Sequence, residues 1–150
     1  MGDIVGDLQK AFAAEPDPPP MSLRAGNAVD SGGPPAPFDP AEDLLTPDYF
    51  EQHFWGIAHL DPQSWRYYIP RLLAYALQSF AAPGLNAVDF ALESLRPPDR
   101  DPLRLGSLSE AQERAVARAL EELAFNESSP WKEPAIIALE EYWAPGAIHR

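Results

Sequence analysis

The densest group of polar and aromatic residues in the sequence is Arg66, Tyr67 and Tyr68, shortly before Pro70. A guanidinium fork beside two phenols could hold a small anion, because it offers paired hydrogen-bond donors. The alternative is structural. A proline inside a helix leaves main-chain carbonyls without donors, and arginine or tyrosine side chains can supply them. The structural interpretation is favoured, and an anion site would require Arg66 to be partly exposed and free of carboxylate partners.

Two histidines, His53 and His59, lie near Glu51 and Asp61 and raise the question of a metal site. They are six residues apart, across Gly56, which is not the i, i+4 spacing with which a helix presents two ligands. Zinc would also need a third ligand and hydrogen bonds that orient the ligands. We therefore predict no metal ion and no other cofactor.

Residue spacing gives little support to nucleophilic or carboxylate catalysis. The chain has no cysteine, and none of its serines stands in a Gly-x-Ser-x-Gly pattern. Pairs such as Glu121/Glu122 and Glu140/Glu141 are adjacent, so on a helix their side chains point about 100° apart and do not converge. We predict no catalytic residue and favour a non-enzymatic role.

Acidic residues are concentrated in the N-terminal part of the chain. The 150 residues carry 23 Asp and Glu against 11 Lys and Arg, a formal net charge of −12. Residues 1–62 hold eleven of these acids and two of the bases, and so carry −9 of the charge. This excess argues against nucleic-acid binding, which needs clustered Lys and Arg. It can serve solubility alone, or form a docking face for a basic protein. The predicted core of that face is Glu42, Asp43, Asp48, Glu51 and Asp61.

The elements that would position these residues are helical. Residues 1–15 predict an N-terminal helix, because Asp3 can cap it and apolar residues recur along one face. Residues 16–40 contain eight of the eighteen prolines, which fix φ and lack an N–H. We expect an extended arm or linker there, with Phe38 as its anchor to the body.

Residues 41–150 predict a helical body. Thr46-Pro47 and Asp61-Pro62 each place a capping side chain before a proline at the first helical position. The helix that begins at Pro62 should be central, because its second half is apolar almost all round. Pro70 is expected to break or kink it near Tyr68.

Three further signals complete the predicted body. Asn86 is expected to cap a short helix, Ser107 and Glu110 to form a capping box, and Pro130 or Pro134 to begin the last helix. Alternation of period two is absent, so the sequence predicts an all-α fold of about five or six helices in one domain. No run reaches the roughly 18 apolar residues of a membrane helix and no signal peptide is present, so we expect a cytoplasmic protein.

The segment from Trp65 to Pro70 is similar to a motif, aromatic-Arg-Tyr-Tyr-Leu-Pro, of a family of small bacterial proteins of unknown function, with Ile69 in place of the usual Leu. Two further parts of that family's pattern have counterparts here: Leu108, Ser109 and Gln112, and then Glu141, Tyr142 and Trp143. The resemblance covers roughly residues 41–144 and leaves the proline-rich arm unmatched. It implies a helical fold and a bacterial source, and no particular chemistry.

The leading expectation is a non-enzymatic protein-binding module. Its most concrete form is a bacterial immunity or antitoxin-like protein that occludes a basic effector with the acidic N-terminal half. One alternative is a small ligand-binding protein or enzyme with the anion site at Arg66, Tyr67 and Tyr68. A third is a homodimer held by the aromatic-rich helices.

Overall fold

The computed structural model describes residues 3–82 and 84–149, which contain seven α-helices. They are α1 (Ile4–Ala11), α2 (Leu23–Asp30), α3 (Pro47–His53), α4 (Pro62–Leu77), α5 (Asn86–Glu93), α6 (Glu110–Phe125) and α7 (Lys132–Ala138). The 3₁₀ helix η1 (Phe54–His59) follows α3 directly, and the π-helical turn η3 (Leu139–Trp143) follows α7 directly. A second 3₁₀ helix, η2 (Leu105–Ser107), lies between α5 and α6. No strand occurs in the described residues. The predicted all-α, single-domain fold is confirmed.

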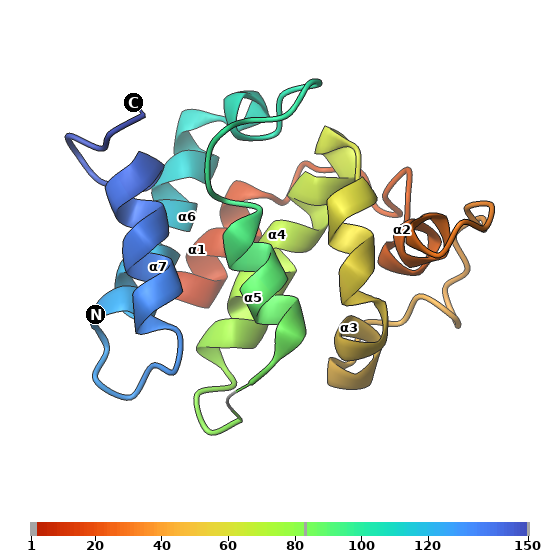
Figure 1. Ribbon diagram of the computed structural model, residues 1–150, viewed down its shortest axis with the longest axis horizontal. Coiled ribbons are helices and arrows are strands. Elements are labelled where there is room, and N and C mark those ends of the chain that lie inside the picture. The colour runs from red at the N-terminus through yellow and green to blue at the C-terminus, as the bar shows by residue number, and fades with distance from the viewer. Residues whose placement is uncertain (1–2, 83, 150) are drawn as a thin grey trace.

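Helix α4 lies at the centre of the molecule. It contacts α1, α5 and α6, and Figure 1 shows α2 and α3 at one end of the long axis with α6 and α7 at the other. Helix α7 packs against α6 and α5, and α2 packs against η1. No helix in the described part of the chain is long and apolar enough to cross a membrane.

The sequence predicts that Pro70 breaks or kinks the helix near Tyr68, and of these two outcomes the break is wrong, because α4 continues through Pro70. An interior proline costs a helix about 3 kcal/mol. Ile69, Leu72 and Leu73 are each at most 1% exposed, and burial of each such side chain contributes roughly 1.5–3 kcal/mol. The packing of these neighbours therefore outweighs the lost main-chain hydrogen bond. Arg71 Nη1 also donates to the carbonyl of Tyr67 at 2.6 Å, within the same turn.

Helix starts that depend on a local capping side chain are mostly confirmed. Asp3, Thr46 and Asp61 each accept a hydrogen bond from the main-chain N–H three residues on. The capping box expected at Ser107 and Glu110 is wrong by two residues. It forms between Ser109 and Gln112, because Ser107 lies in η2 and its hydroxyl donates to the carbonyl of Arg104.

The start of α5 is capped from a different helix. Asn86 is its first residue and not its cap. The carboxylate of Glu51, on α3, accepts hydrogen bonds from the main-chain N–H groups of Asn86 at 2.9 Å and Ala87 at 3.2 Å. A carboxylate there also meets the positive end of the helix dipole.

Replacement of Glu51 by alanine is expected to destabilise the fold by about 1 kcal/mol, because two N–H groups at the start of α5 lose their acceptor. Urea unfolding would measure this change. Glu121→Ala, at an exposed position on α6, is the matched control and should change stability by less than about 0.5 kcal/mol. Equal effects of the two variants would contradict the capping role of Glu51.

The proline-rich segment 16–40 contains α2, so the expectation of an extended arm is wrong for residues 23–30. The eight prolines flank this stretch and leave it free to form a helix, which begins where the Ser22 hydroxyl accepts from the N–H of Ala25 at 2.9 Å. Phe38, the expected anchor, is only half-buried, whereas Leu23 is fully buried. The segment is thus an integral part of the body.

Candidate functional site

Arg66, Tyr67 and Tyr68 do not converge on an open site. Arg66 Nε lies 2.8 Å from Oε1 of Glu15, and Gln112 donates to the other oxygen of that carboxylate. The Arg66 charge is therefore neutralised within the chain, and the condition set for an anion site is not met. Tyr67 stacks under the guanidinium of Arg71, 3.7 Å from the ring centre.

Tyr68 has a structural contact as well. Its hydroxyl accepts from the main-chain N–H of Leu23 at 3.0 Å and so holds the start of α2. Burial raises the pKa of Tyr68 to about 12. The phenol is therefore neutral at physiological pH.

Asp43 is the most buried of the five predicted docking residues, with 3% of its surface exposed. Its carboxylate accepts two hydrogen bonds from Arg24, at 3.1 and 3.0 Å, one from the Tyr49 hydroxyl at 2.7 Å and one from the N–H of Asp39 at 2.8 Å. Burial acts to raise the pKa of this carboxyl, but the hydrogen bonds outweigh it and hold the pKa below its usual value. Asp43 joins α2, α3 and the loop between them.

Asp61 and Glu51 also bond within the chain, as the caps of α4 and α5. Glu42 and Asp48 are different: both are exposed, and neither forms an ion pair or side-chain hydrogen bond within residues 3–82 and 84–149. Together with Leu44 they line a hollow of about 330 Å³, which we call the acidic hollow. Of the predicted face, these two residues line the same open hollow.

His53 and His59 contact different residues of α2. His59 Nε2 is 2.9 Å from Oδ1 of Asp30, and His53 Nδ1 is 3.4 Å from the Asn27 amide nitrogen. Among the residues that the structure describes, no three His, Asp or Glu side chains are grouped as a metal site would require. Burial, followed by the charge of Arg24, lowers the pKa of His53.

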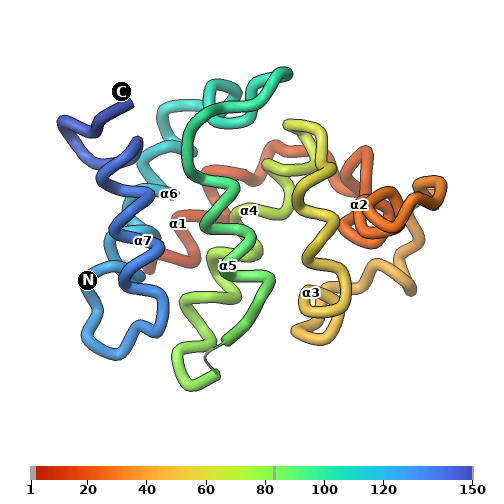
Figure 2. The backbone as a smooth tube through the Cα atoms, in the orientation of Figure 1, coloured from red at the N-terminus to blue at the C-terminus, as the bar shows by residue number. Residues whose placement is uncertain are grey.

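A second cavity, of about 330 Å³, was not predicted from the sequence. Its walls come from η1, from α5 and from the loop of residues 96–105. Figure 2 shows the chain leading from α5 toward α6 through this loop. We call it the arginine pocket, because Arg96, Arg100 and Arg104 all contribute to its lining.

Asp99 orders the loop that carries these arginines. Its carboxylate accepts from the main-chain N–H groups of Arg100, Arg104, Leu105 and Gly106, at 2.8–2.9 Å. Burial acts to raise the pKa of Asp99, and the four N–H groups outweigh it, so that the pKa falls below its ordinary value. Asp99 is therefore ionised at physiological pH and fixes the loop as one unit.

Arg104 is the most unusual side chain of the arginine pocket. It is only 3% exposed, and Nη2 donates to the carbonyls of Ile57 at 2.8 Å and Leu60 at 2.7 Å. Its buried Nε has no hydrogen-bond partner in the described part of the chain. Burial, and then repulsion from Arg100, lowers the pKa of Arg104 to about 10, so it still carries its charge at neutral pH.

A family model described as "Family of unknown function (DUF6714)" matches residues 2–147. The chain belongs to this family. No curated protein and no solved structure matches it.

The family match includes residues 16–40, which the resemblance drawn from the sequence left out. The extent of the family match agrees with the structure, in which α2 packs on η1 and belongs to the same body as α4. The family description carries no activity.

One signal in the sequence could have indicated the arginine pocket. Arg96, Arg100 and Arg104 recur at every fourth position. The stretch between them contains three prolines, which prevent a regular helix. The prolines of that stretch predict only a loop. Asp99 orders this loop by accepting a hydrogen bond from the N–H of Gly106, seven residues later, and no local pattern predicts that contact.

Proposed function

We propose that this protein is a non-enzymatic binding protein that docks a basic protein partner at the acidic hollow. The observation that carries the proposal is the exposure of Glu42 and Asp48, while Asp43, Glu51 and Asp61 bond inside the chain. Carboxylates free of partners in their own chain can pair with a cation from outside.

The rest of the hollow supports a basic partner. Leu44, which also lines the hollow, is 65% exposed. Arg24, which also lines the hollow, is neutralised by Asp43, so the local charge stays negative. A lysine or arginine side chain fits this surface, because its apolar stem can cover Leu44 while its charged end reaches a carboxylate.

The most concrete form of the proposal is a cytoplasmic immunity or antitoxin-like protein from a bacterium, which covers a basic effector. The polarised charge supports it, with −9 of the net −12 in residues 1–62. Such a field accelerates association with a basic protein and makes that association sensitive to salt.

The test compares two double variants that remove the same charge. Glu42→Gln/Asp48→Asn removes the free carboxylates of the acidic hollow, and Glu121→Gln/Glu127→Gln removes two exposed carboxylates elsewhere. A partner captured at low salt from the source organism would be purified and its dissociation constant measured against each. We expect the hollow variant to bind at least about tenfold more weakly, with a flatter salt dependence, and the control to bind as the wild type does. Equal binding by both variants, or no partner at low salt, would refute the proposal.

A further inference from the structure

Two guanidinium groups in the arginine pocket have no carboxylate partner. Neither Arg100 nor Arg104 forms an ion pair within residues 3–82 and 84–149. We propose that this pocket binds a small organic anion whose carboxylate or phosphate head meets Arg100 and Arg104 and whose apolar body lies against Phe90 and Pro98. This site goes beyond the proposed docking of a basic protein and uses different residues.

A purely structural role does not account for Arg104. Its bonds to the carbonyls of Ile57 and Leu60 use Nη2 alone, and a neutral amide could make them. What remains is a charge, whose Cζ lies 6.0 Å from the centre of the Trp65 ring, and a buried Nε with no acceptor among the residues that the structure describes. A buried donor left unpaired costs about 1–3 kcal/mol, and more when the group is charged. An oxyanion in the pocket would offset the cost of the buried charge.

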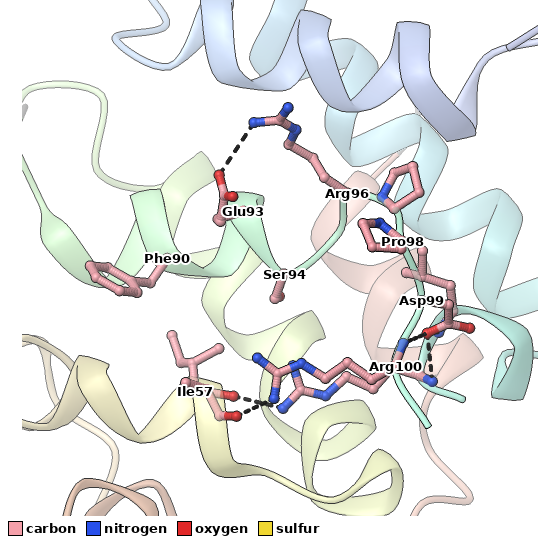
Figure 3. Close-up of a pocket in the computed structure, with 12 residues that line it drawn as sticks. Ile57, Phe90, Glu93, Ser94, Arg96, Pro98, Asp99 and Arg100 are labelled. Atoms are coloured by element: carbon pink, nitrogen blue, oxygen red, sulfur yellow. Dashed lines mark hydrogen bonds and ion pairs between the residues drawn. The ribbon is translucent and has the colours of Figure 1, made fainter. Parts of the chain in front are cut away.

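Arg100 adds the second positive charge. Its Nη1 donates to the carbonyl of Ala58, and Figure 3 shows its side chain running along the pocket toward the turn that carries Ile57. The proximity of Arg100 is one cause of the lowered pKa of Arg104. Two like charges at one pocket repel each other, and an anion between them would turn this repulsion into attraction.

Arg96, in the same pocket, differs from Arg100 and Arg104 because it is paired with carboxylates. Its guanidinium donates to both oxygens of Glu141, at 2.9 and 2.8 Å, and lies 3.3 Å from Glu93. In Figure 3 it points away from Arg100. Arg96 therefore serves the packing of α7 and η3 against α5, and the ligand charge is assigned to Arg100 and Arg104 alone.

The walls of the pocket favour an organic anion over a bare inorganic ion. Ile57, Phe90, Pro98 and Leu105 contribute apolar surface, and a volume of about 330 Å³ is within the range of small-molecule sites. Phe90 is held by ring contacts to Phe54 and Trp55, each with centres 4.9 Å apart. Because Asp99 also orders the loop in advance, a ligand would bind without a large ordering cost.

The test uses four probes at constant ionic strength, with chloride as the balancing anion: benzoate, phenyl phosphate, acetate and benzyl alcohol. Arginine Nε–H signals in ¹H–¹⁵N NMR spectra of the full chain report directly on Arg100 and Arg104, and Arg104→Lys assigns the second signal by its loss. We expect benzoate or phenyl phosphate to shift both signals, and the better of the two to bind at least about tenfold more tightly than acetate or benzyl alcohol. The ratio between benzoate and phenyl phosphate tells which head group is preferred.

Two variants then distinguish binding at this site from nonspecific electrostatic attraction. Arg100→Gln is expected to weaken binding of the preferred probe at least about tenfold, because it removes an exposed charge of the pocket and spares the bonds of Arg104. Arg114→Gln, at an exposed position on α6, changes net charge equally and should bind as the wild type does. Unmoved Nε–H signals with every probe, equal binding of benzyl alcohol and benzoate, or wild-type affinity in Arg100→Gln would each overturn the proposal. None of these results depends on the acidic hollow.

Discussion

Replacement of Asp43 by alanine is expected to lower the free energy of unfolding by about 3–5 kcal/mol, as for a buried ion pair that loses one partner. The Asp43 carboxylate is the common acceptor of Arg24, Tyr49 and the N–H of Asp39. Without it, the Tyr49 hydroxyl loses its acceptor and the Arg24 charge loses its counterion. Because the whole domain is stabilised by only about 5–15 kcal/mol, such a loss would be visible in urea unfolding and as a lower Tm.

Two further variants make this expectation specific. Asp43→Asn keeps the shape and one acceptor oxygen, so its effect should lie between those of the wild type and Asp43→Ala. It also serves as the measurable variant if the alanine form does not fold. Glu42→Ala changes the exposed neighbouring acid and should alter stability by less than about 0.5 kcal/mol. A loss in Glu42→Ala as large as that in Asp43→Ala would contradict the assigned role.

The same carboxyl should make stability depend on pH in acid. Its folded pKa is held below the ordinary value of 3.8, so the unfolded chain binds the proton more tightly. The contribution of Asp43 is therefore present above that ordinary value and is lost as the pH falls through the lowered folded pKa. The difference in unfolding free energy between wild type and Asp43→Asn should narrow as the pH is lowered from about 5 to about 2. A difference that stays constant over this range would contradict an ionised Asp43.

Features of the fold that depend on neighbours in sequence could be predicted from the sequence. The caps at Asp3, Thr46 and Asp61 each need only a side chain and an N–H three residues away. Features that depend on a distant partner could not. The start of α5 is satisfied by Glu51 of α3, and Pro70 is tolerated because the surroundings of α4 are buried.

The candidate sites show the same division. Composition located the acid excess, but it did not show that Asp43 would be buried against Arg24 while Glu42 and Asp48 stayed exposed. Residue type made Arg66 the candidate for anion binding, yet Glu15 neutralises it from 51 positions away. Within residues 3–82 and 84–149, Arg100 and Arg104 are instead the arginines of a pocket that form no ion pair. Burial and pairing decide which charged side chains are available to a ligand, and both are set by tertiary contacts.

Replacement of Gly56 by alanine is expected to be as damaging as the loss of Asp43, through a different cause. Helix α2 approaches η1 so closely that a Cβ at Gly56 would lie 2.2 Å from the carbonyl oxygen of Leu23 and 2.7 Å from the N of Asn27. Both obstacles are main-chain atoms, which cannot rotate away as a side chain would. Overpacking a core costs about 1–3 kcal/mol and more where nothing can yield, so we expect a loss of about 3 kcal/mol or more in urea unfolding.

The expected damage at Gly56 extends to the arginine pocket, because η1 also carries the carbonyl of Ile57 to which Arg104 donates. The Arg104 Nε–H signal should therefore shift in Gly56→Ala even without a ligand. Gly33→Ala is the matched control. Its Cβ would lie 3.4 Å from its nearest neighbour, an ordinary contact, so this variant should leave both stability and that signal unchanged.

Gly26→Ala tests the same close approach from the α2 side, since its Cβ would meet the carbonyl oxygen of Gly56 at 2.6 Å. If both close-contact variants unfold like the Gly33 control, α2 does not pack on η1 at backbone distance, and the position of the carbonyls that hold Arg104 would need another cause.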